Sequence, residues 1–313
     1  MNLEDFLNLP TGKVADIVRS KGPKVCVFPT DGTRRWHMLE HPESTSLESY
    51  MEVQRKRHLE LYELFFDHGI DTLLSPIFRP DLLDRGEAYM KEVMKPLTWL
   101  ASHPSYLSFY KDYGVSFHVY GEFREYLRST QHGYLLDIYD RLTDLTRDRR
   151  SHRLFFGIFM SDPTETISKL ISEFYSEKNR PPDKKELIEM YYGEYVDPAD
   201  MLIGFGRFCV HDAPLLLGRE GLYFTTSPSL YINQQHLRMI LYDYIYMQRN
   251  STPDYGDLSQ EDRVKMRDYY RSNLDKIIRI SENRGVLLSH LSDGSAMQDY
   301  YQVSDDNPRR IVQ

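Results

Sequence analysis

Residues 31–36, Asp-Gly-Thr-Arg-Arg-Trp, follow one residue after an apolar run that ends in a proline. Arginine offers a planar fork of donors that suits phosphate oxygens, so Arg34 and Arg35 could together grip one diphosphate. Asp31 could hold Mg²⁺, which usually takes one or two carboxylates along with substrate phosphates. Gly32 would let backbone N–H groups of a following helix approach the phosphates. An Asp-Gly turn with solvated arginines explains the same spacing about as well.

The elements that must position this segment are short apolar runs alternating with longer amphipathic ones. The expected strands are Lys24–Pro29, Asp71–Pro76, Val115–Tyr120, Arg153–Phe159, Asp200–Gly204 and Gly221–Thr225. The expected helices are residues 46–69, Gly86–Ala101, Asp162–Lys178, Pro182–Tyr192, a segment from Asn233, and Ser259–Ile280. Strands alternating with helices predict a parallel sheet with helices on both faces.

In such sheets ligands bind beyond the carboxyl ends of the strands, and Asp31 with its two arginines lies at that end of the first strand. We therefore predict an α/β fold, one domain with a central, mostly parallel sheet flanked by helices, and a helical C-terminal appendage. The domain is expected to span residues 1–290. Residues 291–313 are expected to form a flexible polar tail.

Composition excludes several classes of protein. The 313 residues are 41% hydrophobic and carry a formal net charge of −8, which argues against a general nucleic-acid binder. No run approaches the roughly 18 apolar residues of a membrane span, and the acidic N-terminus is unlike a signal peptide. Two cysteines, Cys26 and Cys209, provide no disulfide framework. A cytoplasmic protein without a membrane span is expected.

The segment VFPTDGTRRWHM (27–38) resembles the signature of cis-prenyltransferases, in which an Asp-Gly-Asn-x-Arg-Trp segment binds an allylic diphosphate with magnesium. Thr33 stands where that family has asparagine. A later segment, ADMLIGFGRF (199–208) with GLYFT (221–225), departs from the family. Gly204 replaces an arginine that helps to bind isopentenyl diphosphate, Phe208 replaces a glutamate, and Gly221 replaces a second metal-binding carboxylate. The resemblance implies this fold with its chain-elongation site dismantled.

A closer resemblance is to the tuberculosinol synthase (tuberculosinyl adenosine transferase) group within the same superfamily. It rests on the segments GPKVCVFPTDGTRRW (22–36), HGIDTLLSPIFRPDLLDRG (68–86), YYGEYVDPADMLIGFGRF (191–208) and LYFT (222–225), and covers roughly residues 3 to 270. That group ionises a bicyclic C20 diphosphate. The resemblance implies that Asp31, Arg34 and Arg35 hold the diphosphate with Mg²⁺ as cofactor. It also implies that Tyr50 and Tyr89 line the cavity.

These residue types suit the chemistry. Loss of diphosphate from an allylic carbon leaves a cation, and a tyrosine ring can face that cation while its hydroxyl orients a water. Core packing is the alternative role for Tyr50 and Tyr89, since the chain has 24 tyrosines. Ser75, at the ligand end of the second strand, and Arg207, near the end of the fifth, are further candidates for diphosphate binding.

The leading hypothesis is a diterpene synthase-type enzyme that ionises a prenyl diphosphate. The cation would then react with water, lose a proton, or pass to an acceptor such as adenosine. Chain elongation by cis-prenyl transfer is a second possibility, against which Gly204 and Gly221 count. A catalytically silent subunit that partners an active cis-prenyltransferase is a third. We also expect a homodimer.

Overall fold

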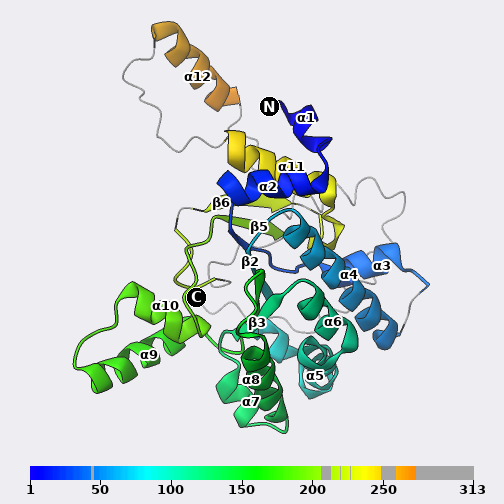
Figure 1. Cartoon of the computed structure of the whole chain (residues 1–313), viewed down its shortest axis with the longest axis vertical. Helices are drawn as coiled ribbons and strands as arrows, with labels where there is room; N and C mark the ends of the chain where they lie inside the picture. Colours follow the sequence, from blue (N-terminus) through cyan, green and yellow to red (C-terminus); the bar gives the residue numbers. More distant parts are fainter. Residues whose placement is uncertain (44–45, 206–212, 219, 226, 248–258, 273–313) are drawn as a thin grey trace. The chain divides into compact units, whose positions relative to one another are not determined.

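The computed structural model describes residues 1–43, 46–205, 213–218, 220–225, 227–247 and 259–272 (Figure 1). The chain divides into two compact units, Met1–Arg249 and Asn250–Gln313. In the second unit the described residues include one helix, α12 (Gln260–Ser272), which lies within the expected helix Ser259–Ile280. The expected boundary at residue 290 stays a prediction.

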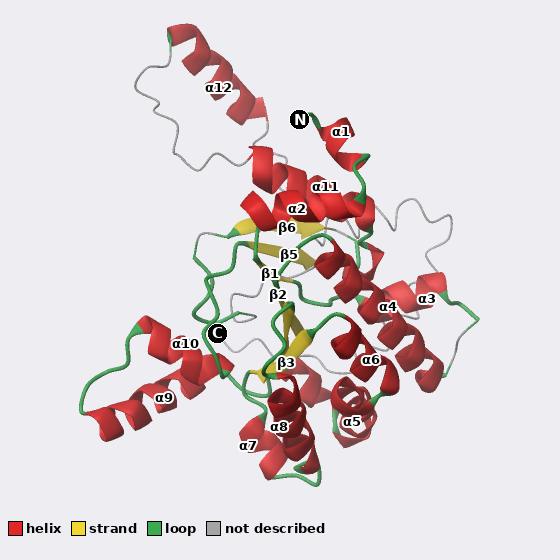
Figure 2. Ribbon diagram, in the orientation of Figure 1, coloured by secondary structure: helices red, strands yellow, loops and turns green. Residues whose placement is uncertain are grey.

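The first unit is built on a six-stranded sheet in the order β3-β4-β2-β1-β5-β6 (Figure 2). All five pairings are parallel, which confirms the predicted α/β class. The strands are β1 (Val25–Val27), β2 (Thr72–Phe78), β3 (Val115–Tyr120), β4 (His152–Ile158), β5 (Met201–Phe205) and β6 (Gly221–Thr225). Each overlaps an expected strand, with ends that differ by at most two residues, because apolar runs this short and rich in branched or aromatic residues favour strands.

The helices of this unit are more numerous than the pattern indicates. They are α1 (Leu3–Leu7), α2 (Thr11–Lys21), α3 (Thr33–Glu40), α4 (Leu47–Asp67), α5 (Glu87–Ser102), α6 (Pro104–Asp112), α7 (Arg124–Arg128), α8 (Tyr134–Thr146), α9 (Pro163–Lys178), α10 (Lys184–Tyr192) and α11 (Gln234–Tyr242). Helical segments of other types are the 3₁₀ helices η1 (Pro80–Arg85) and η3 (Ser229–Tyr231) and the π-helix η4 (Asp243–Met247). None of the helices in the described ranges is both long and apolar enough to cross a membrane.

Local signals explain where two of the helices begin. Ser46 caps α4, since its hydroxyl accepts a hydrogen bond of 3.1 Å from the Ser49 N–H. Further along, Asp183 and Glu186 form a reciprocal capping box at the start of α10. The Ser46 cap fixes the residue at which α4 begins, and this matters because Tyr50 lies in the first turn of that helix.

Alternate residues of the strands face two different apolar layers. Cys26 and Phe28 join the larger layer, which also contains Tyr62 and Phe65 of α4. Their neighbour Val27 joins the smaller layer, which contains residues of α10. The Phe28 and Phe65 rings lie 5.0 Å apart, so α4 packs directly over β1.

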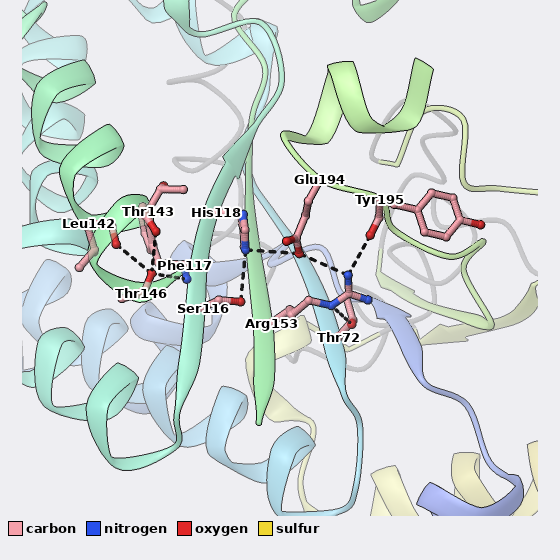
Figure 3. Close-up of polar contacts among 10 residues, drawn as sticks. All are labelled: Thr72, Ser116, Phe117, His118, Leu142, Thr143, Thr146, Arg153, Glu194 and Tyr195. Atoms are coloured by element: carbon pink, nitrogen blue, oxygen red, sulfur yellow. Dashed lines mark hydrogen bonds and ion pairs between the residues drawn. The ribbon is translucent and has the colours of Figure 1, made fainter. Parts of the chain in front are cut away.

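A polar network ties the segment after α10 to the opposite, amino-terminal end of the sheet (Figure 3). Arg153 donates hydrogen bonds to Thr72 Oγ1 at 2.9 Å, to Glu194 Oε1 at 3.3 Å and to the Tyr195 carbonyl at 2.9 Å. Buried His118 lies 3.5 Å from the same Glu194 oxygen. Burial lowers the pKa of His118 to about 4, so the imidazole is neutral at pH 7. This network stabilises the scaffold away from the predicted site.

Candidate active site

The segment that carries Asp31 is anchored on both sides at the carboxyl edge of the sheet. Parallel pairing continues past β1, since the Phe28 N–H donates to the Leu74 carbonyl at 2.8 Å and the Thr30 N–H to the Pro76 carbonyl at 3.3 Å. On the other side, the backbone N–H and hydroxyl of Ser229 both donate to the Asp31 carbonyl, at 3.0 and 2.8 Å. The Asp31 backbone is therefore fixed where ligands bind in parallel sheets.

Gly32 turns the chain from the strand into α3. Its φ of +74° lies in the left-handed region that side chains disfavour. A Cβ at this position would lie 2.6 Å from Phe205 Cε1 and 3.0 Å from Pro228 Cβ, so only glycine fits without displacement. The α3 helix starts at Thr33 without a side-chain cap, which leaves backbone N–H groups of its first turn available to an anion.

Aromatic rings support the two arginines of the segment. The Arg34 guanidinium lies 5.0 Å from the centre of the Tyr89 ring, and the Arg35 guanidinium lies 4.9 Å from that of Phe205. A further arginine, Arg85, lies 5.1 Å from the Tyr89 ring. Cation–π contacts of this kind hold a guanidinium in place without neutralising its charge. Both arginines of the segment are therefore positioned to bind an anion.

The Asp31 side chain meets an arginine from the neighbouring strand. Arg79 directly follows β2, and its Nη1 lies 3.3 Å from Asp31 Oδ2. Its Nε lies 3.5 Å from an oxygen of Asp81. Burial raises the pKa of the Asp31 carboxyl, and nearby Asp81 adds to this effect, whereas Arg79 and Arg35 lower it. Asp31 is thus a partly buried carboxylate surrounded by guanidinium groups.

Tyr50 and Tyr89 lie in the first turns of α4 and α5, next to the Asp31–Trp36 segment. The Tyr50 hydroxyl and Thr33 Oγ1 are hydrogen-bonded at 2.9 Å. Burial raises the pKa of Tyr50, although its contacts with Thr33 and Arg34 lower it, so the phenol is protonated at neutral pH. Tyr89 packs partly buried against the larger apolar layer and beneath Arg34. The tyrosines, Thr33 and Arg34 therefore form one connected group.

Two other predicted site residues have different outcomes. Ser75 was expected at the ligand end of the second strand, and this placement is wrong. It lies within β2, because the strand continues to Phe78, and its buried hydroxyl is hydrogen-bonded to the Tyr62 hydroxyl at 3.1 Å. Arg207 lies outside the described residues. Its role in diphosphate binding stays a prediction.

Sequence reasoning missed two residues that the fold brings to the site. Arg79 is a basic residue directly after a strand, which is the signal that identified Asp31 and could have identified Arg79 too. Phe205 ends β5, the strand beside β1, and supports Arg35. An aromatic residue in a buried strand is expected for core packing alone, so the sequence did not identify Phe205 as a site residue.

The donors present suit Mg²⁺ that arrives with a diphosphate. Across the described ranges, no three His, Cys, Asp or Glu side chains gather into a potential metal site. Asp31 nevertheless offers one partly exposed carboxylate at the edge where phosphates would lie. Since Mg²⁺ commonly binds through one or two carboxylates, substrate phosphates and water, a single protein ligand is compatible with this ion.

The chain is similar along most of its length to two curated enzymes. It is 42% identical over 286 residues to tuberculosinyl adenosine transferase of Mycobacterium tuberculosis, a match covering 90% of this chain and 96% of the relative. It is 26% identical over 265 residues to (+)-kolavelool synthase of Herpetosiphon aurantiacus, covering 82% and 86%. No family model matches the sequence.

Solved structures show the same fold at low sequence identity. Lavandulyl diphosphate synthase from Lavandula x intermedia, in complex with dimethylallyl diphosphate, has a TM-score of 0.53 and 15% identity, covering 76% of this chain and 98% of that one. A probable undecaprenyl diphosphate synthase from Campylobacter jejuni has a TM-score of 0.53 and 12% identity, covering 72% and 97%. The predicted homodimer and cytoplasmic location stay predictions. By sequence and by fold, the chain belongs to the tuberculosinyl adenosine transferase family of enzymes, built on the cis-prenyltransferase fold.

Proposed function

We propose that the protein is a diterpene synthase-type enzyme, which releases diphosphate from an allylic, bicyclic C20 prenyl diphosphate with the help of Mg²⁺. The resulting cation reacts with water, loses a proton, or is transferred to an acceptor such as adenosine. The observation that carries this proposal is the group at the carboxyl edge of β1: Asp31, Arg34 and Arg35 beside the phenols of Tyr50 and Tyr89.

The first step breaks the bond between the allylic carbon and the diphosphate oxygen. Both electrons leave with the diphosphate, so negative charge develops on the leaving group as positive charge develops on the carbon. Arg34, Arg35 and the backbone N–H groups at the start of α3 are the donors for that developing negative charge. Mg²⁺, when bound, would neutralise part of the diphosphate charge, with Asp31 as its protein ligand.

The second step consumes the cation. A water oxygen can attack it and then lose a proton, which gives an alcohol. A carbon next to the cation can instead lose a proton, which gives a hydrocarbon. A nitrogen lone pair of adenosine can also attack, which gives an adenosine conjugate. The Tyr50 hydroxyl, already hydrogen-bonded to Thr33 at 2.9 Å, is the group that we assign to orienting the nucleophile.

The relatives support this choice of chemistry. One is named for transfer of a tuberculosinyl group to adenosine and another for synthesis of kolavelool. Chain elongation is disfavoured because Gly204 and Gly221 provide no side chains where elongating enzymes have an arginine and a carboxylate. Gly204 lies inside β5 and Gly221 begins β6, so neither position offers a replacement group.

The direct test is incubation of the purified full chain with Mg²⁺ and a panel of linear and bicyclic C15–C20 diphosphates, with and without adenosine. Diphosphate release and mass spectrometry of the products report the reaction. We expect release from a bicyclic C20 substrate, with an alcohol, hydrocarbon or adenosine conjugate as product. Products lengthened by isopentenyl units would instead identify an elongating enzyme, and no reaction with any substrate would favour a silent subunit.

A further inference from the structure

We propose that Arg57 is a positioning residue of the active site, which holds the 3₁₀ helix η3 against α3 and thereby aligns α3 with α4. The proposal rests on the proposed function for its effect on the reaction, since α3 carries Arg34 and Arg35 and α4 carries Tyr50. Arg57 acts through the elements that it joins, without contact with the substrate.

The helix η3 braces α3 at both of its ends. At the start of α3, the N–H and the hydroxyl of Ser229 donate to the Asp31 carbonyl at 3.0 and 2.8 Å. At the other end, the Tyr231 hydroxyl donates to Glu40 Oε1 at 2.6 Å, and Glu40 is the last residue of α3. The direction of α3, and with it the direction of its first N–H groups, therefore depends on where η3 lies.

Arg57 on α4 fixes the position of η3 through two backbone oxygens. Its Nε donates to the Leu230 carbonyl at 3.0 Å, and its Nη2 donates to the Ile232 carbonyl at 2.7 Å. Its Nη1 donates to Glu60 Oε2 at 2.9 Å, so the guanidinium is also tied to its own helix. Because the donors form a rigid planar fork, they define the orientation of η3 as well as its distance from α4.

Tyr50 and Arg57 lie on one face of α4, since roughly two helical turns separate them. The Tyr50 hydroxyl meets Thr33, the first residue of α3, at 2.9 Å. Arg57 meets the helix that braces α3. α4 is therefore joined to α3 twice, once directly through a phenol and once through η3. The second connection keeps Tyr50 at a fixed position relative to Arg34 and Arg35.

Apolar packing alone keeps η3 in the fold but does not set its direction. The side chains of Leu230 and Ile232 are buried in the larger apolar layer. Apolar contacts have no preferred direction and so tolerate small shifts, whereas hydrogen bonds from a planar guanidinium do not. Loss of the Arg57 side chain should therefore displace η3 slightly without unfolding the domain.

A small displacement of α3 affects the reaction more than it affects binding. Diphosphate binding depends mainly on the charges of Arg34 and Arg35, which act over several ångströms. Stabilisation of the departing diphosphate depends on how the donors are aligned, and a misplacement of about 1 Å can lower a rate a hundredfold. Arg57 should therefore influence kcat much more than KM.

The test compares Arg57→Gln and Arg57→Lys with a matched control, Arg153→Gln, in the full chain. The Arg153 side chain is 27% exposed, against 24% for Arg57, and it also donates to a backbone carbonyl, but at the opposite edge of the sheet (Figure 3). kcat and KM are measured with the bicyclic C20 diphosphate that reacts fastest in the panel above. Inorganic diphosphate is titrated by calorimetry, and hydrogen exchange of the backbone is followed by mass spectrometry.

In Arg57→Gln, kcat should fall about tenfold to a hundredfold, whereas KM and the Kd of inorganic diphosphate should change roughly threefold at most. Hydrogen exchange should become faster in residues 31–36 and 227–232 and stay unchanged elsewhere. Arg57→Lys keeps a charged donor without the fork, so part of the lost kcat should return. Arg153→Gln should keep kcat and the exchange of residues 31–36 as they are in the unmodified protein.

Two results would overturn the proposal. Unchanged kcat in Arg57→Gln, or an equal loss of kcat in Arg153→Gln, would show that Arg57 has no positioning role of its own. Unchanged exchange of residues 31–36 in Arg57→Gln would show that η3 does not hold α3.

The two kinds of failure can be told apart. If the unmodified protein releases no diphosphate from any substrate, the proposed function fails, and the effect of Arg57 on the reaction fails with it. The exchange measurement needs no substrate and still decides whether Arg57 holds α3 in place. Thermal unfolding of each variant checks the fold, and Arg57→Lys carries the test if Arg57→Gln does not fold.

Discussion

Replacing Tyr50 with phenylalanine should change the products of the reaction more than its rate. The substitution keeps the ring that can face a cation and removes the hydroxyl, which is hydrogen-bonded to Thr33 at 2.9 Å. Diphosphate release depends on Arg34, Arg35 and Asp31, which are unchanged. Tyr50→Phe should therefore still release diphosphate, with a lower fraction of alcohol and a higher fraction of eliminated hydrocarbon.

The size of this effect follows from the hydrogen bond to the nucleophile that the Tyr50 hydroxyl makes in the proposed function. One hydrogen bond of this kind contributes about 0.5–1.5 kcal/mol. At about 1.4 kcal/mol for each tenfold change, the ratio of alcohol to hydrocarbon should fall roughly two- to twelvefold. Gas chromatography of the products gives this ratio for each variant, and diphosphate release is measured in the same reactions.

Thr33→Val is the matched control, because it breaks the same hydrogen bond from the other side and leaves the phenol in place. Each single variant should lose about 0.5–1.5 kcal/mol of unfolding free energy, and the double variant should lose little more, since both remove one bond. The product ratio should change less in Thr33→Val than in Tyr50→Phe. An equal change in both variants, or no change in Tyr50→Phe, would refute a direct role of the hydroxyl.

Asp31→Asn and Arg34→Ala should each abolish diphosphate release, while the far-ultraviolet circular dichroism spectrum stays unchanged. Near-normal turnover in either variant would exclude the proposed site. Isopentenyl diphosphate should not be incorporated, because Gly204 offers no guanidinium, and detection of C25 or longer products by mass spectrometry would contradict this. Burial raises the pKa of the Glu122 carboxyl to about 7, above its ordinary 4.5. Between these two values the folded state binds more protons than the unfolded state, so the free energy of unfolding should fall as pH rises from 4.5 to about 7. Glu122→Gln should flatten that dependence in urea unfolding at pH 5 and pH 8, and an unchanged slope would show that Glu122 is not its source.

The apolar runs by themselves determined the sheet. Each of the six strands is a short, largely apolar run, and all except the edge strand β6 are mostly buried. Strand structure follows from local properties such as branched side chains and alternation. The same local pattern placed Asp31 and its arginines at the carboxyl edge of β1. The helices α2, α6 and α8 were not among the expected ones, although α8 has its buried residues Leu135, Leu136, Tyr139 and Leu142 at helical spacing.

Ser75 shows the limit of locating a site from strand ends. The pattern placed Ser75 at a strand end, but backbone pairing extends β2 to Phe78 and leaves the hydroxyl bonded to Tyr62 of α4. Where a strand stops depends on the pairing offered by its neighbours, here β4 as well as β1. The sequence of one strand does not contain that information.

The sequence by itself determined which residue types stand at the site: a carboxylate, a glycine and two arginines after the first strand. Only the tertiary structure decided their partners. Arg79 meets Asp31 across 48 positions of sequence, and Tyr50 meets Thr33 across 17. Such pairs depend on strand register and on how α4 packs over the sheet, both of which are set by the whole core. Local sequence therefore fixes the chemical groups, and long-range packing fixes which of them act together.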